Sequence, residues 1–338
     1  MSITRVAVDV MGGDHAPGVL LQGVLQACDP ASELALDPAR VLLVGDEATI
    51  RAGLSEVGAT QEFEIRHASQ AVGMDEKPAQ ALRKKPDSSI AGCVAAIKSG
   101  EAGALISMGN TGVVVGCATL GLSMLSGVRR PAIAVTLELT GHPVTLLDMG
   151  ANIAPRPQDL LEYAVMGQIY ATGCLGVDKP RVGLLNIGEE ETKGTELLRG
   201  AHGLLSAADF DFVGNVEGGD IFKDRADVVV TDGFTGNVVL KLLEDFASFM
   251  MGLVLRELTE HKVQWGPEAL HKVKKHIDYS EYGGALLLGV KGVVVIGHGR
   301  SDANAVSNAI HVAARALDAD VNGSIVRGLA STQDGAPA

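Results

Sequence analysis

Residues 227–258 read DVVVTDGFTGNVVLKLLEDFASFMMGLVLREL, and this stretch sets the fold class that we expect. Its β-branched run Val228–Val230 predicts a buried strand. The segment Thr231–Asn237, with two glycines, predicts a turn into a long helix capped by Thr235 or Asn237. A strand, a glycine turn and a helix N-terminus in this order leave backbone N–H groups free beside the positive end of the helix dipole. The stretch therefore predicts an α/β fold with an anion site where the helix begins.

The far half of this helix is apolar on nearly every side. From Phe246 to Leu255 the only polar side chain is Ser248, so this part must be buried in the core, in a partner or in lipid. The run is too short to span a bilayer, but it can lie in the membrane interface as the tip of a helical hairpin. A contact between two subunits suits an all-round apolar helix equally well. The residues that we expect to contact the membrane are Phe249, Met250, Met251, Leu253, Val254 and Leu255.

The composition fits a large α/β protein in a reducing compartment. Of 338 residues, 46% are hydrophobic, only 4% are aromatic and 42 are glycine, which suits many tight strand–helix turns. The net charge of −13 argues against nucleic acid as a partner, and any acidic partner must meet a local basic patch. The four cysteines have no paired spacing, which predicts free thiols and no zinc site. We expect no signal peptide, because the N-terminus leads directly into a strand.

Apolar β-rich runs alternate with helical patterns along the chain. This alternation predicts βαβ units and an open, largely parallel sheet with helices on both faces. The uncharged segment 102–128 is divided by a turn, so we expect buried core there and no membrane span. We expect one domain over residues 1–330, a helical excursion at about 235–282 and a disordered tail at 331–338. The expected strands are Val6–Val10, Val41–Val44, Phe63–Ile65, Ala104–Ile106, Ile133–Leu137, Val144–Leu147, Val182–Leu185, Val228–Val230 and Val293–Ile296.

Polar turns with glycine follow many of these strands. In an open parallel sheet the carboxyl ends of the strands form the ligand crevice, so such turns converge there. The alternative is that glycine, aspartate and asparagine simply build turns. The six turns are Asp9–Pro17, Ser107–Gly112, Asp148–Asn152, Asn186–Gly194, Asp232–Asn237 and Gly297–Asn304.

Lys193 is the first candidate for chemistry. A lysine in the opening turn of a helix opposes the helix dipole, so it needs a compensating group such as a bound phosphate. The acidic residues Glu189–Glu191 could instead form a plain ion pair with it. The amides of Asn186, Asn237 and Asn304 can donate hydrogen bonds to phosphate or to a developing oxyanion, although each can also cap a helix or a turn.

Other candidates are titratable, and absent motifs narrow the chemistry. His15 is a candidate general acid or a helix cap, whereas Asp14, Asp148 and Asp232 are candidate bases or residues that only hold a turn. The sequence has no dinucleotide fingerprint, P-loop, H-E-x-x-H or G-x-S-x-G motif. We therefore expect no cofactor and no metal, and we expect inorganic phosphate itself to be a reactant.

Together these motifs resemble the phosphate acyltransferases of bacterial phospholipid synthesis, the PlsX family. The match runs in order over essentially the whole range Arg5–Leu329, although Arg300 stands where many relatives have a small residue. The motifs that carry it are Val8–Pro17, Met74–Pro78 with Ala81–Lys85, Ser107–Gly112, Leu147–Asn152, Asn186–Glu190 with Thr192–Gly194, Thr231–Asn237, and His298–Gly299 with Ser301–Ala303.

The resemblance implies a fold similar to phosphotransacetylases and isopropylmalate dehydrogenases, with two α/β lobes, a central cleft and a homodimer. It also implies a reaction in which a long-chain acyl–acyl carrier protein and inorganic phosphate give acyl phosphate and free carrier protein. Phosphate is already a nucleophile, so the protein must position it and stabilise the tetrahedral oxyanion. We expect Lys193 and Asn237 at the reacting centre, with His15 and Asp232 as second choices. The expected substrate and phosphate contacts are Asn186, Gly233, Thr235, Gly236, Gly109, Asn110, Thr111 and Asn304.

The implied partners are acyl carrier protein, a second copy of the chain, a membrane surface and a downstream glycerol-3-phosphate acyltransferase. We expect a cytoplasmic protein held peripherally on the inner face of the cell membrane. Because carrier proteins are acidic, we expect one of two basic clusters to meet them: Arg83–Lys85, or Lys272 with Lys274 and Lys275. Three alternatives stay open: a phosphotransacetylase acting on acyl-CoA, a decarboxylating hydroxyacid dehydrogenase, and a non-catalytic membrane scaffold. The last would have no reason to keep six polar turns at strand ends.

Overall fold

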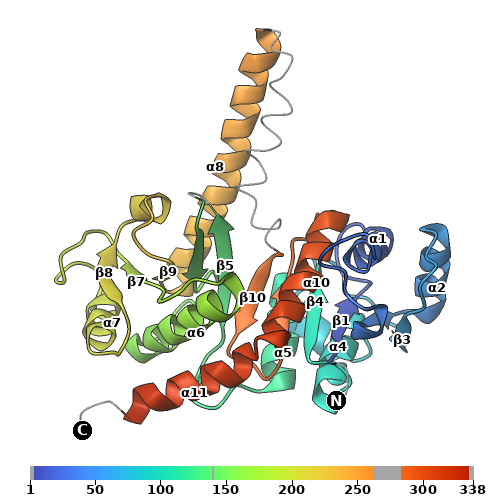
Figure 1. The fold of residues 1–338 in the computed structure, drawn as a ribbon, viewed down its shortest axis with the longest axis horizontal. Helices are drawn as coiled ribbons and strands as arrows, with labels where there is room; N and C mark the ends of the chain where they lie inside the picture. The colour runs from blue at the N-terminus through green and yellow to red at the C-terminus, as the bar shows by residue number, and fades with distance from the viewer. Residues whose placement is uncertain (1–3, 139–140, 262–282, 335–338) are drawn as a thin grey trace. The chain divides into compact units, whose positions relative to one another are not determined.

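The computed structural model describes residues 4–138, 141–261 and 283–334, and the chain divides into two compact units (Figure 1). Unit 1 comprises Met1–Pro131 with Tyr282–Ala330, and unit 2 comprises Ala132–Glu281 with Ser331–Ala338. The predicted basic cluster of Lys272, Lys274 and Lys275, and the part of the predicted helical excursion from 262 to 282, lie outside the described part of the chain.

Unit 1 is built on a mostly parallel sheet with the strand order β3-β2-β1-β4-β11-β10. Only β10 runs antiparallel, to β11. The β-branched and aliphatic residues of β1, β2, β4 and β11 are buried, as expected for central strands of a parallel sheet. The strands are β1 (Val6–Asp9), β2 (Val41–Gly45), β3 (Glu64–His67), β4 (Ala104–Ser107), β10 (Ala285–Leu288) and β11 (Val293–Ile296).

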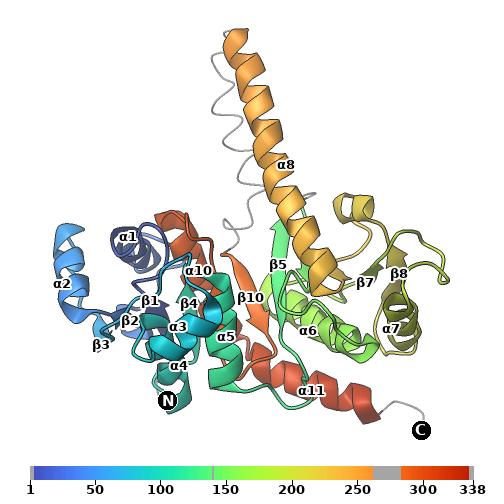
Figure 2. The same ribbon diagram turned by 180° about the vertical axis from the view of Figure 1, so that it is seen from behind.

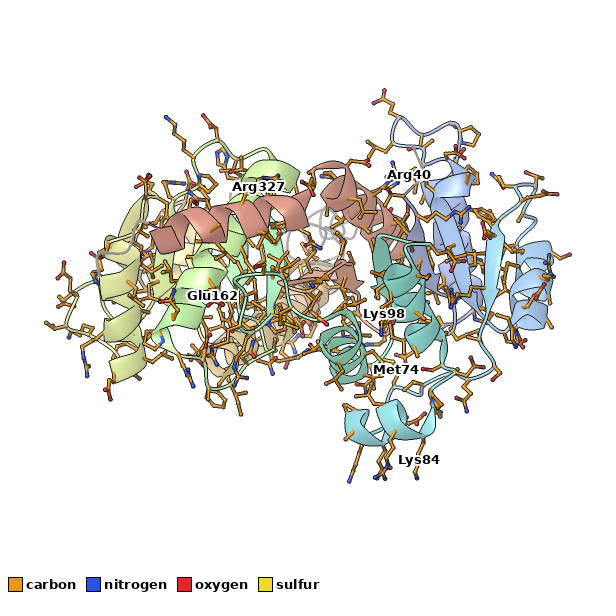
Figure 3. The ribbon with its side chains drawn as sticks, turned by 90° about the horizontal axis from the view of Figure 1, so that it is seen from below. Arg40, Met74, Lys84, Lys98, Glu162 and Arg327 are labelled. Carbon is orange, nitrogen blue, oxygen red and sulfur yellow. The ribbon has the colours of Figure 1, made fainter. Side chains whose placement is uncertain are left out.

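Helices cover both faces of this sheet. One layer contains α1 and α10, which pack closely on each other, and the other contains α4 and α5 (Figure 3). The helices of unit 1 are α1 (Gly18–Ala27), η1 (Pro38–Arg40), α2 (Glu47–Glu56), α3 (Pro78–Lys84), α4 (Ser89–Ser99), α5 (Thr111–Leu122) and α10 (Ala303–Asp318). The uncharged segment 102–128 forms β4, which is fully buried, and α5, which buries Val113, Val114, Ala118 and Leu122 but exposes Leu120. The prediction of core is therefore confirmed for β4 and for one face of α5.

Unit 2 has the strand order β5-β6-β9-β7-β8, in which only the pair β5–β6 is antiparallel. Helix α6 packs on β6, β9 and α7. The strands are β5 (Ala132–Glu138), β6 (Pro143–Leu147), β7 (Val182–Leu185), β8 (Phe212–Val216) and β9 (Val228–Val230), and the helices are α6 (Pro157–Leu175), α7 (Glu196–Ser206), η2 (Gly218–Phe222) and α8 (Gly233–Glu260).

The predicted strands are all present, and the largely parallel α/β fold is confirmed. Two further strands, β8 and β10, were not predicted. The predicted caps of the long helix are wrong: α8 begins at Gly233, because the carboxylate of Asp232 accepts hydrogen bonds from the N–H groups of Phe234 and Thr235 and so caps the helix.

Of the expected tail at 331–338, the structure describes residues 331–334, and they are helical. Helix α11 (Val321–Asp334) continues through residues 331–334. Its buried residues Val321, Ile325 and Leu329 follow helical spacing, so the helix is anchored along one face up to the position where the tail was expected to fray.

Only the beginning of α8 packs against the other described elements. Its buried residues are Gly233, Gly236 and Leu240, and beyond them the helix runs away from the strands of unit 2 (Figures 1 and 2). The apolar run is exposed, at 63% for Phe249 and 44% for Leu255. The apolar run of α8 was expected to be buried, but the described residues do not cover it. Among those residues no helix is both long enough and apolar enough to cross a membrane.

Candidate active site

The turn after β6 is built around the buried carboxylate of Asp148. One of its oxygens, Oδ1, accepts hydrogen bonds from the N–H groups of Ile133, Gly150 and Ala151 at 3.0, 3.1 and 2.9 Å. The other, Oδ2, accepts from the Asn152 N–H at 2.7 Å. Burial raises the pKa of this carboxyl, and the hydrogen bonds oppose that shift. Asp148 was predicted to be either a base or a residue that only holds a turn, and the structure supports the second role.

The start of α8 packs directly on that turn. A methyl group on Gly233 would lie 2.6 Å from the carbonyl oxygen of Asn152, and one on Gly236 would overlap the carbonyl oxygen of Asp148. The two glycines of the predicted turn thus belong to the first helical turn. They are needed because two pieces of backbone meet without room for a Cβ atom.

The backbone N–H groups at the start of α8 all have acceptors within unit 2. The Gly233 N–H donates to the Asn152 carbonyl at 2.8 Å. Those of Phe234 and Thr235 donate to Asp232 Oδ1 at 3.0 and 2.9 Å, and that of Gly236 donates to the Asp232 carbonyl. The predicted set of free N–H groups is therefore wrong, since Asp232 satisfies the orphan donors. Thr235 Oγ1 also donates to Asp232 Oδ2, at 2.7 Å.

Asn237 presents an exposed amide beside the same turn. A methyl group on Gly150 would lie 3.4 Å from the amide carbon of Asn237. The structure records no hydrogen bond for this amide within the described ranges. Asn237 is therefore placed where the turns after β6 and β9 meet, with donors available to a ligand.

The segment after β7 places Asn186 and Lys193 together. Asn186 Oδ1 accepts from the Ile187 N–H at 2.9 Å, and its Nδ2 donates to the Lys193 carbonyl at 3.2 Å. Lys193 precedes α7, whose first residue is Glu196 and whose cap is Thr195. The predicted place of Lys193 in a helix's opening turn is therefore wrong, because Thr195 caps the helix two residues later.

The side chain of Lys193 is exposed and has no ion pair in the part of the chain that the structure describes. Glu189, which could have neutralised it, is paired with Arg225. That ion pair lowers the pKa of Glu189. An exposed cation without a carboxylate partner remains available to an anionic ligand.

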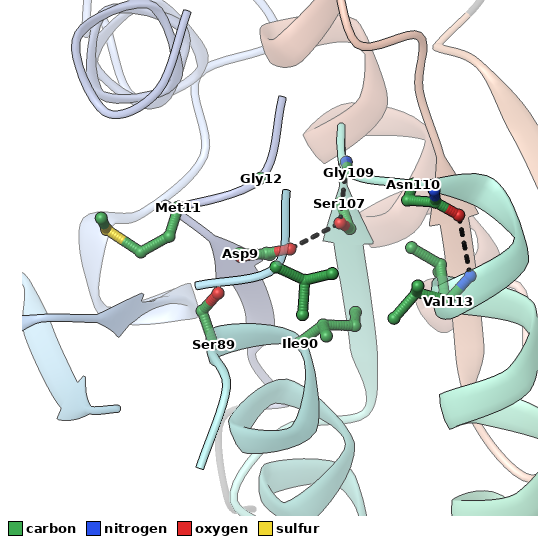
Figure 4. A pocket seen from close by; sticks show the side chains of 11 residues that line it. Asp9, Met11, Gly12, Ser89, Ile90, Ser107, Gly109, Asn110 and Val113 are labelled. Atoms are coloured by element: carbon green, nitrogen blue, oxygen red, sulfur yellow. Dashed lines mark hydrogen bonds between the residues drawn. The ribbon is translucent and has the colours of Figure 1, made fainter. Parts of the chain in front are cut away.

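In unit 1 the turns after β1 and β4 meet at the carboxylate of Asp9. Ser107 Oγ donates to Asp9 Oδ2 at 2.6 Å and accepts from the Gly109 N–H at 3.1 Å (Figure 4). Asp9 is 3% exposed, and its Oδ1 has no hydrogen-bond partner among the described residues. These groups line a small pocket together with Gly12, Ser89 and Asn110.

The charge of this pocket decides what it can hold. Burial raises the pKa of Asp9, with the Ser107 hydrogen bond opposing the shift. A carboxyl group, neutral or ionised, offers no positive charge to a phosphate dianion. The predicted phosphate contacts at Gly109, Asn110 and Thr111 thus gain no support from the charge beside them.

Asn110 also has a structural task. Its Oδ1 accepts from the Val113 N–H at 3.2 Å and caps α5, while its Nδ2 donates to the Met74 carbonyl at 2.6 Å. Thr111, by contrast, is exposed in the first turn of α5. The amide of Asn110 would have to leave both partners before it could bind a ligand.

The remaining predicted residues lie around the turns after β1 and β11. The Asp14 N–H donates to the Gly299 carbonyl at 2.8 Å, so these two turns are in contact. His15 is exposed just before α1, and Asn304 is exposed in the first turn of α10, which Asp302 caps. The three polar turns of unit 1 thus meet, and in unit 2 the turns Asp148–Asn152 and Asp232–Asn237 meet. His15, Gly109, Asn110, Thr111 and Asn304 belong to unit 1, and Asn186, Lys193, Asp232, Gly233, Thr235, Gly236 and Asn237 belong to unit 2.

Two buried polar residues were missed by sequence reasoning. Asp9 is a charged residue at the end of an apolar strand, and this position could have marked it as a candidate from the sequence. Asn215 lies in β8, a strand that was not predicted, and its amide Nδ2 donates to the Glu190 carbonyl at 2.9 Å. In the described ranges no group of three or more histidine, cysteine, aspartate or glutamate residues is placed to hold a metal ion.

Comparison with known proteins gives a consistent family. The model of a family described as "Fatty acid synthesis protein" matches residues 4–324. A phosphate acyltransferase from Heliobacterium modesticaldum is 49% identical over 316 residues, covering 91% of this chain and 92% of the relative. Another from Desulfitobacterium hafniense is 44% identical, covering 93% and 94%.

Solved structures with the same fold are more distant in sequence. A phosphotransacetylase from Streptococcus pyogenes superposes with a TM-score of 0.58 at 17% identity, covering 94% of this chain and 95% of that one. The EutD phosphotransacetylase from Staphylococcus aureus gives 0.59 at 13% identity, covering 92% and 93%. At these identities the likeness establishes the fold and no more.

Proposed function

This chain belongs to the fatty acid synthesis protein family of phosphate acyltransferases, and we propose that it forms a long-chain acyl phosphate from acyl–acyl carrier protein and inorganic phosphate. The enzyme is thus an acyltransferase of phospholipid synthesis. The observation that carries the proposal is identity of 49% and 44% to phosphate acyltransferases, extending over more than nine-tenths of the chain.

The protein has little covalent chemistry to perform in this reaction. A phosphate oxygen attacks the thioester carbonyl, the C–S bond breaks, and the thiolate leaves and is then protonated. The protein must hold phosphate against the carbonyl and stabilise the oxyanion that forms. Lys193 and Asn237 suit these tasks, since each exposes a donor that has no partner among the described residues.

The proposed acyl donor is a carrier protein, and helix α3 offers a surface for it. Arg83 and Lys84 are exposed at its end, and Figure 3 shows Lys84 pointing outward. Lys85 is engaged with Glu76 and with the carbonyl of Ala71. Arg83 and Lys84 form no ion pair with any described residue, so in a chain of net charge −13 they offer positive charge to an acidic partner.

The test is a comparison of acyl donors. With phosphate saturating, the purified enzyme is given the same long-chain acyl group on acyl carrier protein or on coenzyme A, and acyl phosphate is measured. We expect the higher kcat/KM with the carrier-linked donor. A higher kcat/KM with acyl-CoA would replace the proposal by a phosphotransacetylase activity.

We further propose that the enzyme is a peripheral membrane protein and a homodimer. Its acyl phosphate product is amphiphilic and is consumed at a bilayer. The apolar run of α8 supplies a surface for lipid, in which Phe249, Met250, Leu253, Val254 and Leu255 are exposed and Met251 is half-buried. Contact of the same run with a second subunit is the competing use.

A further inference from the structure

Both backbone polar groups of Lys193 are fixed in place. Its N–H donates to the Glu190 carbonyl at 3.0 Å, and its carbonyl accepts from Asn186 Nδ2 at 3.2 Å. The Glu190 carbonyl accepts a second hydrogen bond, from Asn215 Nδ2 at 2.9 Å. Two buried amides therefore hold the peptide groups of Lys193, one directly and one through Glu190.

Asn215 is buried to an extent that requires an explanation. It is 1% exposed, and its Oδ1 lacks a hydrogen-bond partner in the described part of the chain. Burying a primary amide with one end unsatisfied costs stability. A smaller apolar side chain would avoid that cost, but it would not hold the Glu190 carbonyl as Asn215 Nδ2 does.

A bulge in β8 sets the position of Asn215. The pairing with β7 shifts from Val182–Phe212 to Leu184–Asn215, so β8 contains one extra residue between these pairs. Gly214 lies in that interval with φ of +87°, a conformation that favours glycine. Bulges re-aim side chains and are frequent next to active sites. Here the bulge brings Asn215 into register beside Leu184, where its amide reaches the segment that carries Lys193.

We infer that Asn215 is a positioning residue for the reaction and that it acts through Lys193. The inference rests on the proposed role of Lys193 in binding phosphate or stabilising the oxyanion. Asn215 does not need to touch the substrate. It holds the Glu190 carbonyl, which holds the Lys193 N–H, and so it limits where the ammonium group can lie. A displacement of about 1 Å in a positioned catalytic group can lower the rate by about a hundredfold.

A double-mutant cycle on acyl phosphate formation tests this. We expect Asn215→Ala to lower kcat/KM by roughly tenfold to a hundredfold, and to speed hydrogen exchange at the Lys193 N–H. In a Lys193→Ala background the Asn215→Ala change should not lower the rate further, because Asn215 is inferred to act through the Lys193 side chain, which that background lacks. Thr145→Val is the matched control. It removes the buried Thr136–Thr145 hydroxyl contact of 3.4 Å in the sheet of unit 2 and should leave kcat/KM unchanged.

The outcomes separate the inference from the proposed function. If Lys193→Ala keeps full activity, the proposed role of Lys193 fails and the inference fails with it. If Lys193→Ala is impaired but Asn215→Ala is not, or lowers the rate equally in both backgrounds, only the inference is overturned. If Asn215→Ala does not fold, Asn215→Asp takes its place, because it keeps the shape and removes the donor to Glu190.

Discussion

Lys193 shows how a residue can be selected from sequence for a reason that the structure corrects. Its expected conflict with a helix dipole does not exist, because α7 begins at Glu196. What distinguishes it is a fixed backbone and an exposed side chain without an ion pair in the described ranges. The sequence around Lys193 shows neither feature, because each depends on a residue from a later segment. Asn215 helps to fix the backbone, and Arg225 pairs with Glu189, which leaves the lysine without that partner.

Replacement of this lysine by alanine is the first test at the residue scale. We expect Lys193→Ala to lower acyl phosphate formation by about a hundredfold to a thousandfold, because a charge-assisted contact to the transition state is lost. Steady-state assays measure it, with circular dichroism as the check of folding. Lys223→Ala, which removes an exposed lysine already paired with Asp220, is the matched control and should stay near full activity. Equal rates for both variants would exclude Lys193 from the mechanism.

Asp9 gives a prediction on stability and pH. Its raised pKa means that the folded protein keeps this proton to higher pH than the unfolded chain does. The corresponding stability is complete below the usual value of 3.8 and is lost as pH rises through the folded pKa. Relative to the unchanged protein, Asp9→Asn should therefore become more stable as pH rises from about 4 towards neutral. Urea unfolding at several pH values measures this difference.

Asp46 is the control with the opposite sign. A hydrogen bond from Thr49 lowers its pKa, so its contribution is present above the usual pKa and is lost as pH falls through the folded value. The stability of Asp46→Asn should therefore fall relative to the unchanged protein as pH rises from below the folded pKa of Asp46 to about 4, and should change little from there to neutral pH. A stability difference for Asp9→Asn that does not vary with pH would contradict the burial argument.

At the scale of single elements, strands with an uninterrupted apolar run were predictable, and β8 was not. Gly214 and Asn215 interrupt its pattern, and the bulge that they form is what places the amide of Asn215. The helix α8 was predictable in existence and length but not in surroundings. The sequence pattern shows that a face of the helix is apolar. It does not show what that face contacts, and the described residues do not bury it.

Helix α3 carries the prediction on the carrier protein. Reversing charge at Arg83 and Lys84 should raise the apparent KM for acyl carrier protein about tenfold, since each exposed charge pair is worth up to about 1 kcal/mol. The dependence of that KM on salt should weaken as well. Lys98→Glu, which reverses an exposed charge at the end of α4, is the control. If all variants share the KM of the unchanged enzyme, the carrier protein binds elsewhere.

The apolar run of α8 carries the prediction on lipid. Met251→Glu with Leu255→Glu should abolish binding to anionic liposomes and leave the dimer intact, because each buried side chain contributes about 1.5–3 kcal/mol. Flotation and analytical ultracentrifugation measure the two properties. Ser248→Glu adds one negative charge, against two in the test variant, at the one polar position of the run and serves as the control. Dissociation into monomers with lipid binding retained would make the run a subunit interface.

For the whole molecule, the family and the fold could be predicted from the sequence, because many short motifs that resemble those of the family follow one another in order along the chain. The meeting of polar turns in unit 1, and of the turns after β6 and β9 in unit 2, could be predicted too, since parallel strands end at a common edge. The assignment of individual groups was not. Asp148, Asn110 and Asp232 read as site residues in sequence, yet their side chains satisfy backbone donors nearby.

The central claim is that phosphate itself attacks the acyl thioester in this enzyme, and isotope labelling tests it directly. The enzyme is given long-chain acyl–acyl carrier protein and fully ¹⁸O-labelled phosphate, and the product is analysed by mass spectrometry. Direct attack predicts an acyl phosphate that keeps every labelled oxygen, the bridging one included. A product whose bridging oxygen is unlabelled, or the release of free fatty acid in place of acyl phosphate, would contradict the account.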